Sequence, residues 1–234
     1  MSKVLLAIPS YHGAFYADGA KTGLFYIEAL HPFNAFRKAG YQVDIVSEDG
    51  HYGIDEHSTI DAFLVGDDGK VYRDANSEFN VALKNTKSAA DVDPKDYKIA
   101  FAAAGHGAMW YPKEATLRKL FVDIYANNGV AAAVCHGPAI FAGLEDPITK
   151  KPFFSGKKAT GFTDIGEVQA GADDAMKKYN LDTIKTLVER DNGTYVEPAG
   201  PWDDFTVADG RFITGVNPQS ATSTAEKAIA AASA

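Results

Sequence analysis

Short apolar runs recur along this chain, with helix-favouring segments between them. Continuous apolar runs of this length are typical of strands that are buried on both faces of a parallel sheet. We predict strands at Val4–Ile8, Gln42–Val46, Lys98–Ala103, Val130–Val134, Lys158–Thr160 and Arg211–Thr214. We predict helices at Gly23–Lys38, Glu78–Lys87, Lys113–Ala126, Asp182–Arg190 and Ala221–Ala232. The alternation predicts an α/β protein, a doubly wound sandwich with helices on both faces of the sheet.

One segment, residues 48–96, interrupts this alternation with many charges and turn-forming residues. We interpret it as an insertion that carries a hairpin and a helix and does not form a separate domain. The whole chain, residues 1–234, is then expected to fold as one α/β domain.

Charge and cysteine content exclude several classes of protein. The chain has 31 acidic and 23 basic residues, a formal net charge of −8, and no basic stripe. An acidic surface repels phosphate, so nucleic acid and anionic membranes are poor partners. A single cysteine, Cys135, excludes an intrachain disulfide. No signal peptide or membrane-spanning run is evident, so we predict a cytoplasmic protein and leave the nucleus open.

The strongest chemical signal is the strand Val130–Val134, which ends abruptly in Cys135-His136-Gly-Pro. A nucleophile on a sharp strand-to-helix turn needs small residues two positions away on either side, and Ala133 and Gly137 satisfy this requirement. A helix that begins after Cys135 would favour the thiolate form through its dipole. The alternative is a cysteine that acts only as a small buried apolar residue.

Three further groups follow predicted strands or lie on a predicted helix. Gly105 and His106 form a glycine-rich loop whose amides could bind an oxyanion or substrate. Glu28 shares a helix face with apolar residues, so we expect it to be buried with a raised pKa and to exchange protons with the cysteine. Glu167 could orient the His136 imidazole. Each also has a purely structural interpretation, as a tight loop, a surface residue or a helix cap.

The six histidines form no compact ligand pair in the sequence, so we predict no metal. They all lie at or before position 136. A class I glutamine amidotransferase needs a histidine well downstream of its cysteine and is therefore excluded.

Several motifs together resemble the ThiJ/PfpI superfamily, and more narrowly its fungal branch of small heat-shock chaperones and glutathione-independent glyoxalases. The motifs are Ala-Val-Cys-His-Gly-Pro-Ala at 133–139, Ala-Gly-His-Gly at 104–107, Gly-Phe-Thr-Asp-Ile-Gly-Glu at 161–167, Asp-Gly-Ala-Lys-Thr-Gly at 18–23, Glu-Ala-Leu-His-Pro-Phe at 28–33, Gly-Pro-Trp-Asp-Asp at 200–204 and Thr-Gly-Val-Asn-Pro at 214–218. The resemblance covers nearly the whole chain.

The resemblance implies a flavodoxin-like fold, a homodimer, and conversion of methylglyoxal to D-lactate by a glyoxalase III-type lyase that needs no cofactor. It implies that Cys135 is the nucleophile, His136 its partner, Glu167 the acid of the triad, and Glu28 the carboxylate beside the cysteine. The Gly105 and His136 amides are then expected to bind the oxyanion.

Other functions remain open from the sequence. The resemblance also implies a stress-related holdase chaperone that binds unfolded client proteins. A reactive cysteine could instead serve as an oxidative-stress sensor. A cysteine peptidase is the least favoured alternative, and the sequence does not decide whether protein deglycation takes place.

Overall fold

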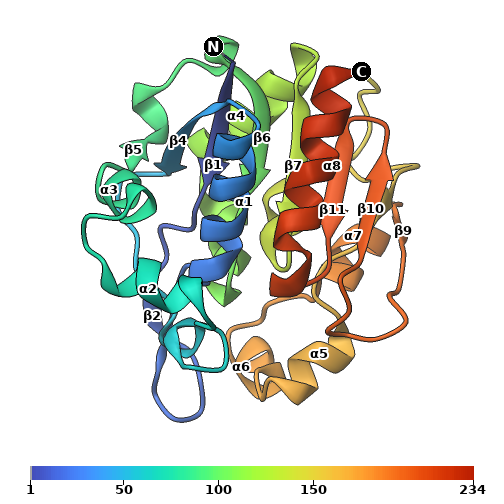
Figure 1. The fold of residues 1–234 in the computed structure, drawn as a ribbon. Coiled ribbons are helices and arrows are strands. Elements are labelled where there is room, and N and C mark those ends of the chain that lie inside the picture. The colour runs from blue at the N-terminus through green and yellow to red at the C-terminus, as the bar shows by residue number, and fades with distance from the viewer. Residues whose placement is uncertain (1) are drawn as a thin grey trace.

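The computed structural model describes residues 2–234 and has a seven-stranded sheet at its centre (Figure 1). The strand order is β10-β11-β7-β6-β1-β4-β5, and every neighbouring pair is parallel except β10 and β11. The strands of this sheet are β1 (Lys3–Ala7), β4 (Gln42–Ser47), β5 (Lys87–Ser88), β6 (Tyr97–Ala102), β7 (Val130–Val134), β10 (Thr206–Asp209) and β11 (Phe212–Gly215). The predicted α/β sandwich is confirmed.

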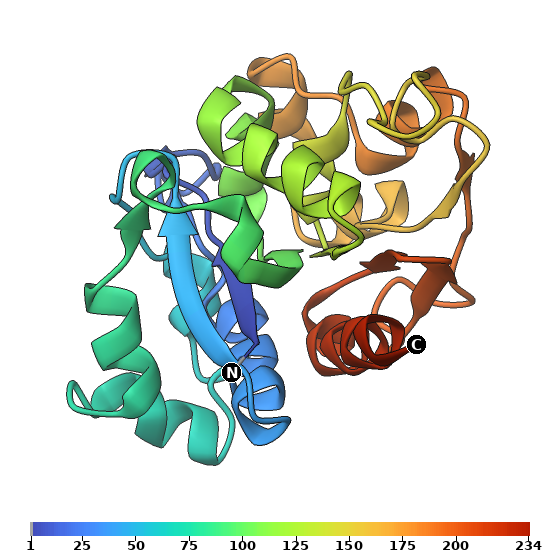
Figure 2. The same cartoon turned by 90° about the horizontal axis from the view of Figure 1, so that it is seen from above.

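Helices cover both faces of the sheet. The α-helices are α1 (Tyr26–Lys38), α2 (Asp67–Arg73), α3 (Glu78–Lys84), α4 (Ala115–Ala126), α5 (Asp164–Gln169), α6 (Asp173–Lys178), α7 (Ile184–Arg190) and α8 (Ala221–Ser233). Helices α1 and α8 pack against each other on one face, and α4 packs on β6 and β7 from the other face (Figures 1 and 2). Among residues 2–234, no helix is both long enough and apolar enough to cross a bilayer.

Small side chains allow the layers at the centre to approach closely. All five residues of β7, Val-Ala-Ala-Ala-Val, are buried between β6 and β11. Helix α8 buries Ala221, Ala225 and Ala228 at a spacing of three to four residues, which places them on the face that meets the sheet. The alanines of this helix therefore provide close packing in addition to helix propensity.

The sequence located the main elements but misjudged two regions. Segment 48–96 contains no hairpin: it contributes α2, α3 and short 3₁₀ helices, and its strand β5 extends the main sheet parallel to β4. The predicted strand at Lys158–Thr160 forms β8 (Lys158–Ala159), but β8 pairs with β9 (Thr194–Tyr195) outside the central sheet. Neither β5 nor β8 has the long apolar run that marks a central strand, so local pairing decided where each of them lies.

Short elements gather at the carboxyl edge of the parallel strands, at the lower end of Figure 1. They include the small sheet of β2 (Gly13–Ala14) and β3 (Lys21–Thr22), the helices α5 and α6, and the 3₁₀ helices η1 (Glu56–Thr59), η4 (His106–Lys113), η5 (Gly137–Phe141) and η6 (Pro218–Ser220). The remaining 3₁₀ helices are η2 (Ala89–Asp91) and η3 (Pro94–Asp96). This edge is where ligands bind in open α/β sheets.

Candidate active site

Cys135 occupies a strained turn directly after β7. Its φ angle is +59°, a left-handed conformation that a non-glycine residue adopts at a cost of about 1–3 kcal/mol. The Cys135 amide donates to the Gly215 carbonyl, and the Cys135 carbonyl accepts from the Phe162 amide, both at 2.9 Å. A Cβ atom on Gly137 would lie 2.5 Å from the Ala102 oxygen and 3.3 Å from the Ala133 side chain. The predicted elbow, with its need for small residues at 133 and 137, is confirmed.

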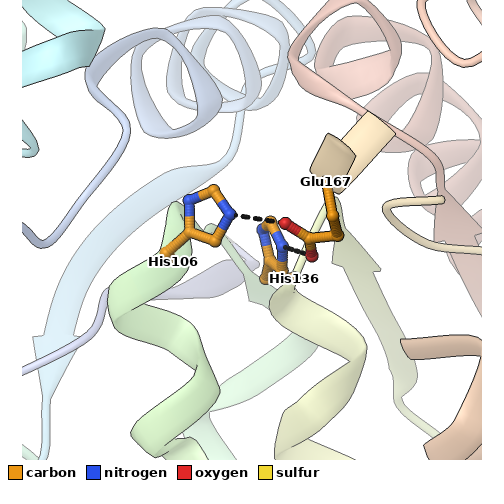
Figure 3. A group of neighbouring side chains, drawn as sticks. All are labelled: His106, His136 and Glu167. Carbon is orange, nitrogen blue, oxygen red and sulfur yellow. Dashed lines mark hydrogen bonds and ion pairs between the residues drawn. The ribbon is translucent and has the colours of Figure 1, made fainter. Parts of the chain in front are cut away.

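A row of hydrogen-bonded side chains begins at this cysteine. Cys135 Sγ lies 3.3 Å from His136 Nδ1. On the other side of the ring, His136 Nε2 lies 2.7 Å from Glu167 Oε1, as Figure 3 shows. Glu167 reaches this position from α5, whose first turn is capped by the Thr163 side chain. The structure thus brings together the three residues that the sequence predicted as a nucleophile, a base and an orienting carboxylate.

Glu28 lies on the other side of the thiol. Its side chain, from the first turn of α1, is 0% exposed, and neither carboxyl oxygen has a hydrogen-bond partner among residues 2–234. The Cys135 thiol and the Ala104 amide are close enough to influence the carboxyl, but neither completes a hydrogen bond of ordinary geometry. Burial dominates and raises the pKa of Glu28 well above its usual value, as predicted.

The sequence favours the thiolate form of Cys135 through the dipole of the following helix, and two features of the structure oppose it. The helix after Cys135, η5, is a 3₁₀ helix of only five residues, so its dipole is small. The thiol is 3% exposed, and burial together with the Glu28 carboxyl raises the pKa of Cys135 well above its usual value. Burial therefore favours the neutral form of each group, and a proton held by the thiol must leave it during the reaction.

Gly105 and His106 both line the pocket, but His106 has a different place from the one that the sequence suggested. Gly105 has a φ angle of +112°, and a Cβ atom there would lie 2.4 Å from the Gly23 oxygen. His106 Nε2 lies 2.8 Å from Glu167 Oε2, so this imidazole binds the carboxylate oxygen that His136 leaves free (Figure 3). With two imidazole partners, the pKa of Glu167 is held well below its usual value despite burial.

Sequence reasoning missed two residues behind His106. The Tyr16 hydroxyl lies 3.0 Å from His106 Nδ1 and donates to Asp55 Oδ2 at 2.8 Å. Thr22 Oγ1 donates to the same carboxylate oxygen at 2.7 Å. Asp55 lies in the segment 48–96, interpreted above as an insertion, and Tyr16 lies in the connection between β2 and β3.

These groups open into an apolar pocket of about 490 Å³. Its wall combines the reactive residues with large aromatic and aliphatic side chains. The lining residues are Tyr16, Asp18, Phe25, Glu28, His57, Ile60, Phe63, Gly105, His106, Cys135, His136, Phe162, Gln169, Ala170, Trp202 and Pro218. A polar reaction centre at the base of an apolar cavity is typical of a small-molecule site.

His106, His136 and Glu167 also have the residue types of a metal site, and their ligand atoms lie within 4.8 Å of one another. Both imidazole nitrogens that face Glu167 are already at hydrogen-bond distance from its oxygens. Protons alone therefore account for this arrangement, and the absence of a metal stays a prediction.

The site contains a buried cysteine on an elbow after a central strand, and a histidine and a carboxylate continue from it as a hydrogen-bonded triad. This arrangement defines a class of α/β proteins that use a cysteine nucleophile. Within that class, the chain belongs to the DJ-1/PfpI family, whose model matches residues 20–231.

Curated relatives include "Glyoxalase 3" of Candida albicans, which is 57% identical over 99% of this chain and 98% of its own. Another is "Glutathione-independent glyoxalase HSP31" of Saccharomyces cerevisiae, 52% identical over 97% of this chain and 96% of its own. The crystal structure of glyoxalase III from Candida albicans superposes with a TM-score of 0.96 and covers 98% of this chain and 97% of that one.

Proposed function

We propose that this protein is a glutathione-independent glyoxalase that converts methylglyoxal to D-lactate. The observation that carries the proposal is the buried Glu28 carboxyl, whose pKa is raised, on one side of Cys135 and the His136–Glu167 pair on the other. Both relatives named above are called glyoxalases, which supports the same activity for this chain. The rearrangement is an internal redox change, so it requires no redox cofactor.

In the first step His136 Nδ1 takes the thiol proton of Cys135, and the sulfur attacks the aldehyde carbon of methylglyoxal. Glu28 then donates its proton to the aldehyde oxygen. The product is a neutral hemithioacetal, with Glu28 ionised and His136 protonated. Before this proton transfer, amides of the loop at Gly105 and of His136 stabilise the developing oxyanion.

Glu28 next acts as the base. It removes the hydrogen from the former aldehyde carbon, and His136 protonates the neighbouring carbonyl oxygen, which gives an enediol. Glu28 returns its proton to that neighbouring carbon from one face, while His136 takes the hydroxyl proton of the sulfur-bearing carbon. The result is a lactyl thioester of a single hand.

Water then releases the product. Glu28, again ionised, takes one proton from the attacking water, and the Cys135 sulfur leaves with the proton held by His136. The sum is methylglyoxal plus water to lactic acid, and each catalytic group returns to its starting protonation state.

The test is D-lactate formation from methylglyoxal, without glutathione, by the wild type and Cys135→Ala side by side. We expect lactate from the wild type only, because the variant has no sulfur to form the hemithioacetal. Equal turnover by Cys135→Ala would contradict the covalent mechanism, and no lactate from the wild type would contradict the function.

A holdase chaperone is a second candidate, favoured by apolar side chains beside the pocket. Ile165 and Val168, 55% and 61% exposed, lie on α5, the helix that also supplies Glu167. Suppression of client aggregation should survive Cys135→Ala and weaken in Val168→Glu if this surface binds unfolded chains. The homodimer and the cytoplasmic or nuclear location remain predictions, testable by light scattering and by microscopy of the tagged protein.

A role as an oxidation sensor is less well supported by the site. A sensor cysteine is an accessible thiolate at rest, whereas Cys135 is buried with a raised pKa. Mass spectrometry after mild peroxide would reveal a sulfinic acid as a gain of about 32 Da on Cys135.

A further inference from the structure

The hydrogen-bonded row does not end at Glu167. It continues through His106 and Tyr16 to Asp55. Six side chains, counted from Cys135, therefore form one continuous row of hydrogen bonds. The proposed reaction uses only the first three of them and Glu28. The positions of the protons along the row define the role of the other three, His106, Tyr16 and Asp55.

Asp55 fixes one end of the row. Its carboxylate accepts from the Thr22 hydroxyl at 2.7 Å, from the Tyr16 hydroxyl at 2.8 Å, and from the amides of His57 and Ser58 at 2.9 and 3.2 Å. The side chain is fully buried. Four donors around one buried carboxyl leave no acceptor for a proton of its own, so Asp55 is ionised.

Tyr16 has one hydroxyl proton and two partners. Burial, with Asp55 as the next cause, raises the pKa of Tyr16 well above its usual value, so the hydroxyl keeps this proton. Because Asp55 can only accept, the proton lies between Tyr16 and Asp55. The Tyr16 oxygen must therefore accept from His106 Nδ1, 3.0 Å away.

Glu167 fixes the other nitrogen of His106. This carboxylate is ionised and has an imidazole nitrogen near each oxygen, at 2.8 Å from His106 and 2.7 Å from His136. An ionised carboxylate can only accept, so both imidazoles direct an N–H toward it. His106 then has a proton on Nδ1 and on Nε2 at the same time.

We infer that His106 is a positioning residue that carries a positive charge at rest. Tyr16 and Asp55 hold His106 in this charged state. The charge on His106 keeps His136 neutral, with the Nδ1 lone pair of His136 directed at Cys135. This inference deepens the proposed glyoxalase function, because the first step of that reaction needs His136 as a base.

The charge on His106 matters because of what surrounds His136. Its ring centroid lies 4.2 Å from that of His106, and Glu167 and Asp55 are the nearby negative charges. The two carboxylates alone would favour a protonated His136, which has no lone pair for the thiol. Burial and the neighbouring His106 instead lower the pKa of His136 below its usual value.

The decisive substitution is His106→Gln, which keeps an amide donor for Glu167 but removes the charge. We expect kcat/KM to fall about 10- to 100-fold at pH 6 and much less at pH 8, because the pKa of His136 rises when the opposing charge is lost. Tyr16→Phe, which removes the acceptor for His106 Nδ1, should shift the acid limb of the profile in the same direction by a smaller amount. His31→Gln is the matched control, since His31 pairs with Asp68 outside the pocket, and its profile should match that of the wild type.

A second measurement does not depend on turnover. Nitrogen-15 NMR of the histidine rings of the wild type at pH 7 should show His106 protonated on both nitrogens and His136 protonated on Nε2 alone. A lone pair on either nitrogen of His106 would overturn the inference, and so would a loss in His106→Gln that is equal at all pH values. If the wild type produced no lactate, the glyoxalase proposal would fail while the NMR result still decided the proton positions.

Discussion

Two buried carboxyl groups flank Cys135, and they have opposite properties. Glu28 is 0% exposed and has no hydrogen-bond partner within residues 2–234, and its pKa is raised. Glu167 is 2% exposed and binds two imidazoles, and its pKa is lowered. Burial is the same on both sides, so the difference shows that the neighbouring donors decide which carboxyl is charged.

This asymmetry gives the two sides of the thiol different chemistry. A neutral acid without fixed partners can give up a proton and take it back, as a proton shuttle must. An ionised carboxylate held by two imidazoles keeps both rings in place, with an N–H of each ring directed at one of its oxygens. If Glu28 were ionised and Glu167 neutral, Cys135 would have neither a proton shuttle on one side nor a correctly held base on the other.

The largest effect that separates the two sides is expected in catalysis. Glu28→Gln preserves shape and neutrality but cannot exchange the proton, so kcat/KM for lactate formation should fall by about 10²- to 10⁴-fold at all pH values. The Cys135 thiol should still react with an alkylating reagent, because the variant retains His136 and Glu167. Turnover by Glu28→Gln within a few fold of the wild type would show that His136 alone moves the protons.

The sequence predicted the rigid half of this site well. The alanine-rich strand, the abrupt turn and the small residues at 133 and 137 are local requirements, and the elbow that they describe is present in the structure. The inward direction of Glu28 followed from helical spacing, and its side chain is buried in the structure.

Long-range contacts account for what the sequence did not predict. Asp55 and Glu167 are more than a hundred residues apart, and no local pattern indicates that Tyr16 and His106 join them in one row. The pKa of the Cys135 thiol is also beyond a local pattern, because it depends on the depth of burial and on the position of the Glu28 carboxyl. Both are properties of the assembled fold.

Glu114 is intermediate between Glu28 and Glu167 in its hydrogen bonding. One of its oxygens accepts from the Ser10 amide at 3.0 Å and the other has no partner within the described part of the chain, so one donor fails to offset burial and the pKa rises to about 7. The pKa of this carboxyl is higher in the folded protein than its value of 4.5 in the unfolded chain. Its contribution to the stability of the fold is therefore fully present below pH 4.5 and is lost as the pH rises toward 7. The free energy of unfolding of Glu114→Gln, relative to the wild type, should therefore increase by about 3 kcal/mol between pH 4 and pH 8.

Denaturant unfolding at both pH values measures this change. Altered packing in Glu114→Gln would change the free energy of unfolding by the same amount at both pH values, so it cancels when the two differences from the wild type are compared. If the difference from the wild type were the same at pH 4 and pH 8, Glu114 would titrate normally in the folded protein and the prediction would be wrong.

A smaller effect compares the stability of Glu28→Gln and Glu167→Gln. At pH 7 the second variant should unfold with a free energy about 2 kcal/mol lower than that of the wild type, because hydrogen bonds to a charged group are lost. The lowered pKa of Glu167 means that its contribution is present above the unfolded value of 4.5 and is lost as the pH falls below it, so the deficit should shrink on acidification. Glu28→Gln should show no deficit at pH 7, since the native Glu28 carboxyl is already neutral there. Equal losses in the two variants would mean that hydrogen-bond partners do not distinguish the two sides of Cys135.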